Sequence, residues 1–155
     1  MKKPEPSATS QFTVMLRRFS PEIVAFAKRC MPKIRRALPG CLQLVYEYRH
    51  CVVISFAQSQ QGAEGIVALS IYPEEIRLYF QGGKFLPDPK GLLQGSAGVR
   101  YVVLESALTI DRPDIQALFK AAIKHRKAKL PRASAAAKSP LIIKSILGKK
   151  PKKTA

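Results

Sequence analysis

The sequence lacks tryptophan altogether and has only two histidines and three cysteines among 155 residues. Cys30, Cys41 and Cys51 are odd in number and form no CxxC pair, so neither a disulfide framework nor a cysteine zinc site is indicated. The first ten residues lack the apolar stretch of a secretory signal. The longest apolar run, 51–57, is far shorter than the roughly 20 residues that a membrane-spanning helix needs. We therefore expect a cytoplasmic protein without a transmembrane segment.

Acidic residues are also scarce, and they are unevenly placed. Ten Asp and Glu face 27 Lys and Arg, which gives a net charge of +17. Every acidic residue lies at or before Asp114, whereas the chain after His125 contains ten basic residues and no acidic one. Most of the excess positive charge therefore belongs to the C-terminal tail.

Two segments have the period of amphipathic helices. Ser20-Pro21-Glu22 has the capping hydroxyl and the first-turn proline of a helix start, and the apolar spacing predicts a helix from Pro21 to about Leu38. Pro32 lies inside this pattern and lacks an amide donor, so we expect a kink or a break near Met31. Residues 111–114 predict the start of a second helix that ends near His125.

Between the helices the apolar period changes to two, which is typical of strands. Short connections between most of the runs favour an antiparallel sheet of about five strands, with the two helices packed on one face. The predicted fold class is thus α+β. We expect an unstructured segment at 1–11, one domain at 12–125 and a basic, mostly disordered tail at 126–155. The five predicted strands lie at 41–48, 51–58, 65–72, 75–80 and 99–105.

Several ordered motifs resemble one known family. Together they are similar to the YdhG-like family, also called domain of unknown function 1801, whose fold is similar to that of frataxin. The resemblance covers about residues 12–125 and implies the fold more strongly than any activity. The motifs are FSPEI at 19–23, the hairpin from Leu42 to Phe56, ALSIYPEEIRLYF at 68–80, LPDPKGLLQGS at 86–96, VRYVVLES at 99–106 and DRPDIQALFKAAI at 111–123.

The same resemblance implies one alternative function, that of an intracellular iron chaperone. Frataxin-like proteins hold iron on a ridge of carboxylates on the first helix and the adjoining strand. The first predicted helix here has only Glu22 among acids, beside five Lys and Arg residues between Lys28 and Arg36. Hard cations prefer clustered oxygen ligands, so this surface departs from the pattern. We predict no metal site and no bound cofactor, and we recognise no catalytic constellation.

A second alternative is a small-ligand domain or an enzyme that uses the Gly/Pro-rich loop at 81–98. This loop matches no phosphate-binding or dinucleotide motif. Turns explain its glycines better than a ligand does, with leucines that fix the loop to the core. If a pocket exists there, its candidate residues are Tyr79, Lys84, Arg100 and Arg112.

The tail predicts the leading function, a nonenzymatic binding domain that associates with nucleic acid or another polyanion. Phosphates release counterions when lysine and arginine neutralise them, so binding needs no particular sequence. Within the tail, residues 139–150 form an apolar peptide that suits a docking helix, a membrane-surface helix or a segment folded back onto the domain. The predicted polyanion-binding residues are Arg126, Lys127, Lys129, Arg132, Lys149, Lys150, Lys152 and Lys153.

Overall fold

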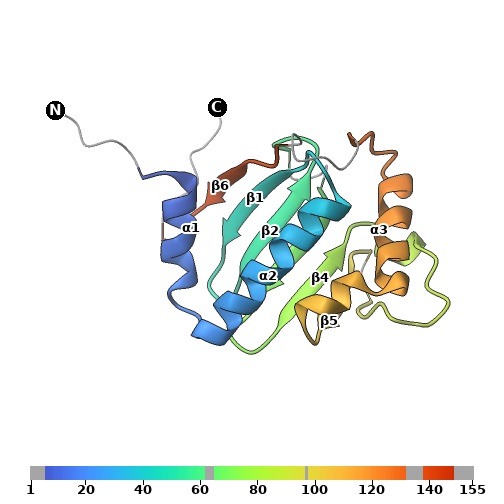
Figure 1. Cartoon of the computed structure of the whole chain (residues 1–155), viewed down its shortest axis with the longest axis horizontal. Helices are drawn as coiled ribbons and strands as arrows, with labels where there is room; N and C mark the ends of the chain where they lie inside the picture. Colours follow the sequence, from blue (N-terminus) through green and yellow to red (C-terminus); the bar gives the residue numbers. More distant parts are fainter. Residues whose placement is uncertain (1–5, 62–64, 97, 132–137, 149–155) are drawn as a thin grey trace.

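The computed structural model describes residues 6–61, 65–96, 98–131 and 138–148 of the chain. Helices and strands form an α+β fold in which three α-helices pack against one sheet (Figure 1). Two short 3-10 helices, η2 and η3, flank the last strand of the antiparallel part. The elements are α1 Ala8–Leu16, α2 Pro21–Ala37, β1 Leu42–Glu47, β2 Val52–Ala57, β3 Gly65–Ile71, β4 Ile76–Phe80, η2 Gly83–Phe85, β5 Arg100–Leu104, η3 Ala107–Asp111, α3 Pro113–His125 and β6 Leu141–Ser145.

The sheet has the strand order β5-β4-β3-β2-β1-β6. Strands β1 to β5 form the predicted antiparallel meander, each paired with the next along the chain. The sixth strand pairs with β1 in the parallel direction. The α+β class is therefore confirmed, but the sheet is mixed and has six strands where about five antiparallel ones were predicted.

Strand β6 comes from the C-terminal peptide that we expected to be helical if a partner ordered it. It folds back onto the domain instead, which was one of the alternatives left open by the sequence. Register with β1 explains why: Leu141 lies opposite Gln43 and Ile143 opposite Val45, on the face that carries the core. The Gln43 side chain also donates to the Ser139 carbonyl at 2.7 Å. The free edge of β1 and its apolar face thus order this peptide as a strand.

Helix α1 begins earlier than predicted. We expected order to start near Phe12, but the helix starts at Ala8, with the Ser7 hydroxyl accepting the Ser10 amide as an N-cap. Phe12, Met15 and Leu16 are buried, so the apolar spacing of this segment serves the core.

Helix α2 is one continuous helix through Pro32, so of the kink or break predicted near Met31 the break is wrong. The Ser20 hydroxyl caps its start as predicted, accepting the Ile23 amide at 3.2 Å. Pro32 itself is exposed, while Cys30 and Ile34 on either side of it are fully buried against the sheet. We infer that this burial outweighs the roughly 3 kcal/mol that an interior proline costs a helix.

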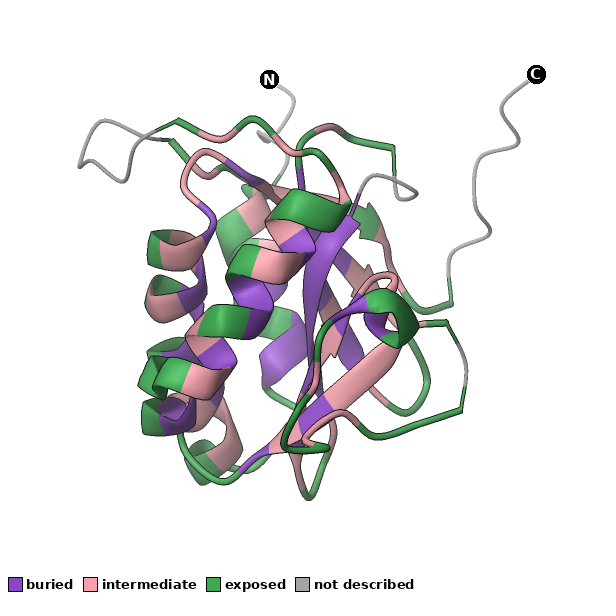
Figure 2. Ribbon diagram, turned by 90° about the vertical axis from the view of Figure 1, so that its right-hand side faces the viewer, coloured by how far each residue is buried: buried purple, intermediate pink, exposed green. Residues whose placement is uncertain are grey.

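The two faces of the sheet have different surroundings. Residues of β4 alternate strictly, with Ile76, Leu78 and Phe80 buried and the two between them half-buried. The buried set faces the helices and joins one core cluster with α1, α2 and α3 residues. Figure 2 shows the helices gathered on one side of the sheet, and no described helix covers the other side. We call this second surface the open face.

Truncating a core-facing residue of β6 tests the pairing of this strand. Ile143 is half-buried against the core, so Ile143→Ala should lower the free energy of unfolding by about 1–2 kcal/mol, below the range for fully buried sites. Lys144→Ala removes an exposed neighbour in the same strand and should change the free energy of unfolding by less than about 0.5 kcal/mol. Urea unfolding followed by circular dichroism measures both. Equal effects of the two variants would contradict the described packing of β6.

Candidate functional site

All five tyrosines of the chain lie on the open face or at its rim. Successive side chains of a strand alternate between faces, and paired residues of neighbouring strands share a face. The register places Tyr79 opposite both Ala68 and Tyr101, and Tyr46 opposite Val53. None of these is opposite a core-facing residue. Tyr48 and Tyr72 continue the same alternation just beyond β1 and β3.

Small side chains lie between these rings. Ser55, Ala68 and Ser70 occupy the middle strands of the same face and are 8%, 9% and 3% exposed. The rings of Tyr46 and Tyr48 are stacked with their centroids 6.3 Å apart, and those of Tyr79 and Tyr101 are 5.0 Å apart. The open face is therefore an aromatic surface over a floor of small residues. We call it the tyrosine face.

Arg77, on β4, lies among three of these tyrosines, Tyr72, Tyr79 and Tyr101. Its guanidinium carbon is 4.7 Å from the ring centroid of Tyr72 and 4.6 Å from that of Tyr101, both within cation–π range. Its Nε donates to the Glu75 carboxylate at 2.8 Å and its Nη1 to the Tyr79 hydroxyl at 3.2 Å. The hydroxyls of Tyr72 and Tyr79 are 3.2 Å apart, so one donates to the other. Rings, hydroxyls and guanidinium form one connected network.

This network keeps its groups in fixed protonation states. The hydrogen bond to Glu75 raises the pKa of Arg77 above its already high ordinary value, and the bond to Tyr79 adds to it. Burial raises the pKa of the Tyr72 hydroxyl, and the hydrogen bond to Tyr79 raises it further. Burial likewise raises the pKa of Tyr46. At neutral pH Tyr46 and Tyr72 are therefore neutral phenols, and Arg77 is a cation.

A second charged surface lies on the opposite side of the molecule. A groove of about 570 Å³ runs between α2 and η3, lined by basic residues of α2 and by Ser106, Ala107 and Leu108. Lys33 pairs with Asp111 across it. Leu108 is 70% exposed at its edge. We call this the basic groove, and its cations are Lys28, Arg29, Lys33 and Arg36.

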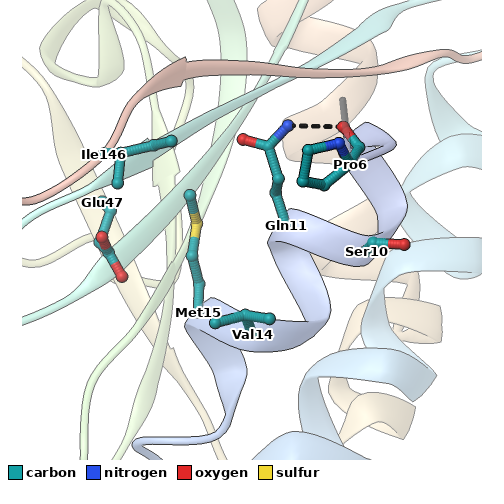
Figure 3. A pocket seen from close by; sticks show the side chains of 7 residues that line it. All are labelled: Pro6, Ser10, Gln11, Val14, Met15, Glu47 and Ile146. Carbon is teal, nitrogen blue, oxygen red and sulfur yellow. Dashed lines mark hydrogen bonds between the residues drawn. The ribbon is translucent and has the colours of Figure 1, made fainter. Parts of the chain in front are cut away.

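A second hollow, of about 560 Å³, separates α1 from the sheet edge formed by β1 and β6. Figure 3 shows side chains of α1 on one side, among them Gln11, whose amide donates to the Pro6 carbonyl at 2.9 Å, and Glu47 and Ile146 on the other. The Glu47 carboxylate accepts the Leu147 amide at 2.8 Å. This carboxylate therefore anchors the end of β6.

The four residues predicted to line a pocket near loop 81–98 do not come together. Tyr79 belongs to the tyrosine face, whereas Arg100 pairs with the core-facing Phe80 and so points to the other side of the sheet. Lys84 lies in η2 with its ammonium 4.8 Å from the Phe85 ring. Arg112 precedes α3 and binds Asp114 through two hydrogen bonds. None of the four lines a groove described above.

The predicted tail residues are described only in part. Lys127 and Lys129 are exposed, and Arg126 is half-buried at the end of α3. The Lys129 carbonyl accepts the Gln58 side chain at 3.4 Å, so this part of the tail runs along the end of β2. Arg132, Lys149, Lys150, Lys152 and Lys153 lie outside the described residues.

The cysteines and histidines are scattered. Burial raises the pKa of Cys30 to about 12 and that of Cys41 to about 11, so both thiols stay protonated at neutral pH. His125 stacks on Phe85, and His50 is exposed in the turn after β1. In the described ranges no three or more His, Cys, Asp or Glu side chains group in a way that could hold a metal ion. The iron-chaperone alternative stays a prediction.

Comparison with known proteins supplies no relative for this architecture. No protein family, curated protein or solved structure matches the chain. The YdhG-like resemblance and the frataxin-like fold therefore stay predictions. Among the described helices, none has the length and apolar character needed to cross a membrane.

The raised pKa of Tyr72 predicts how stability changes in alkali. The unfolded chain ionises this tyrosine near its ordinary pKa of about 10, while the folded chain holds the proton to a higher pH. The contribution is therefore complete below about pH 10 and is lost as pH rises through the folded-state pKa. Above pH 10 the free energy of unfolding of the Tyr72→Phe variant should therefore fall less steeply with pH than that of the wild type. Urea titrations at stepped pH measure both. Identical slopes would show that Tyr72 is not protected from ionisation.

Proposed function

We propose that this protein is a nonenzymatic binding protein for nucleic acid or a related polyanion, drawn to it by charge through its cationic tail. One observation supports this proposal above the others: the positive and negative charges are segregated. The acidic residues all precede the tail, and the folded part uses many of them for its own contacts.

The described carboxylates illustrate this internal use. Asp88 accepts the amides of Leu92 and Leu93 at 2.8 and 2.9 Å, as a turn residue does. Four others bind side chains or amides of the protein itself, namely Glu47, Glu75, Asp111 and Asp114. Glu75, Asp111 and Asp114 are compensated by ion pairs within the fold, whereas the ten cations of the tail have no acidic residue among them in the sequence.

Strand β6 determines where the last part of the tail is attached. Because β6 is parallel to β1, it ends at the same end of the sheet as β1, and the Leu147 amide binds Glu47 there. The sequence then continues from Gly148 into KKPKK at 149–153. Four lysines therefore follow directly after a residue fixed to the edge of the sheet.

The basic groove supports the same function from the folded part. Arg29, Lys33 and Arg36 follow one another along α2 at four- and three-residue spacing, which places their side chains on one helix face, and Arg29 and Arg36 are exposed. Phosphates of a bound strand attract such a row without any base contact.

A salt series tests the role of the tail. The truncation 1–148 keeps β6 and removes KKPKK, whereas a cut at residue 125 would also delete a strand of the sheet. We expect full-length protein to bind a labelled oligonucleotide with an affinity that falls steeply with salt. The truncation should bind more weakly, with a slope of log K against log salt smaller by up to about 3, because each phosphate contact on a single strand contributes about 0.7.

The matched control for this truncation is Pro151→Ala, which changes the same segment and keeps its charge. It should bind like the wild type. Unchanged affinity and slope after removal of residues 149–155 would contradict a role for these lysines. Absence of binding by the full-length protein at low salt would overturn the proposed function itself.

A further inference from the structure

The chain sorts its aromatic residues by face. Phe56, Phe80 and Phe119 are at most 1% exposed in the core beneath the helices. The tyrosines, in contrast, are on the open face and its rim, half-buried or exposed, with Tyr48 at 49%. Tyrosine has an apolar ring and a polar hydroxyl, so it suits a surface that is wet yet presents ring area to a ligand. Core packing alone does not account for this division.

We propose that the tyrosine face is a stacking surface for the bases of single-stranded nucleic acid. This inference rests on the proposed function and names the kind of strand that the site takes. Bases of an unpaired strand are free to stack on aromatic rings, and such stacking tolerates any sequence because every base has a π-face. The bases of a duplex are already stacked inside it and do not offer their faces.

Arg77 fixes the arrangement of the rings around it. Its guanidinium lies between the rings of Tyr72 and Tyr101 and is held there by Glu75 and Tyr79. Because Glu75 compensates its charge, the contribution of Arg77 is to hold these rings in one preorganised arrangement on which bases can stack. The small floor residues Ser55, Ala68 and Ser70, on β2 and β3, lie between the ring of Tyr46 on β1 and the rings on β4 and β5.

Charge also argues against the main competing occupant, a second copy of the chain. Two copies packed through their tyrosine faces would bring together two proteins that each carry a net charge of +17. Like charges so placed repel one another, whereas a strand of phosphates complements them.

The test compares a labelled single strand of thymidylates with a duplex of the same length, both bound by the full-length protein. Tyr48→Ala and Tyr101→Ala each remove one ring. A stacked base is worth about 1–3 kcal/mol, so each variant should weaken single-strand binding by about fivefold or more. Duplex binding, which depends on the cationic segments, should be unchanged. Fluorescence anisotropy measures all affinities.

Two kinds of control variant separate stacking from other roles. Tyr48→Phe and Tyr101→Phe keep the ring and should retain single-strand affinity. If the tyrosines bound the strand through their hydroxyls instead, these two variants would lose affinity. Phe85→Ala removes an aromatic ring that is 65% exposed on η2, away from the tyrosine face, and should bind like the wild type. Thermal melts show whether each variant is folded. If an Ala variant is unfolded, the Phe variant at the same position still tests whether the ring without its hydroxyl is sufficient for single-strand binding.

The remaining outcomes each overturn the inference in a recognisable way. If single strand and duplex bind equally and the Ala variants change neither, the charge-driven function stands and the stacking surface is wrong. If neither strand form binds at low salt, the proposed function fails and the inference fails with it. If the wild type sediments as a dimer and Tyr48→Ala as a monomer, a second copy covers the face and the inference is likewise wrong.

Discussion

Burial of only one face of the sheet by the helices is the constraint on which the rest of this structure depends. The three α-helices and the core-facing side chains of the strands form one apolar cluster. Alternate positions of β4 and β5 contribute apolar residues to this cluster, namely Ile76, Leu78, Val102 and Leu104. The positions between them face the other way, and there the chain places Arg77, Tyr79, Tyr101 and Val103. The same alternation thus builds the core and the tyrosine face.

The free edge of β1 is the second consequence of this arrangement. An unpaired strand edge offers amides and carbonyls for another strand, and a hydrophobic edge tends to aggregate. Here the C-terminal peptide occupies it as β6 and adds Leu141 and Ile143 to the buried side. The peptide therefore protects the edge and anchors the lysines that follow it in the sequence. One short strand links the stability of the fold to the position of its charge.

The parts of the fold with strong local signals could be predicted from the sequence. The period-two runs gave five strands in the right order, and Ser20-Pro21 marked the start of α2. The strand at 141–145 could not be assigned, because a short apolar run fits a helix and a strand equally, and its pairing depends on an edge a hundred residues away. Of the kink or break predicted at Pro32, the break was wrong because burial on both sides of this residue stabilises the helix, and a local rule does not include that burial.

The candidate site was less predictable than the fold. Tyr79 and Arg100 were placed in one pocket from their closeness to the loop at 81–98, but the pairing of Phe80 with Arg100 sends their side chains to opposite faces. The tyrosine face itself was missed, although its signal was present in the alternation of Tyr46, Tyr48, Tyr79 and Tyr101. Alternation shows which residues share a face in one strand. It does not show which face the helices cover, and that decides whether the tyrosines are core or surface.

Intrinsic fluorescence gives the most direct measurement of the central claim. The chain has no tryptophan and five tyrosines, so its ultraviolet emission comes from the tyrosine face. Titration with an unlabelled single strand should quench this emission to a plateau, because bases stacked on the rings accept their excitation. Emission that stays constant while a labelled strand is shown by anisotropy to be bound would contradict the account and place the bound strand elsewhere on the molecule.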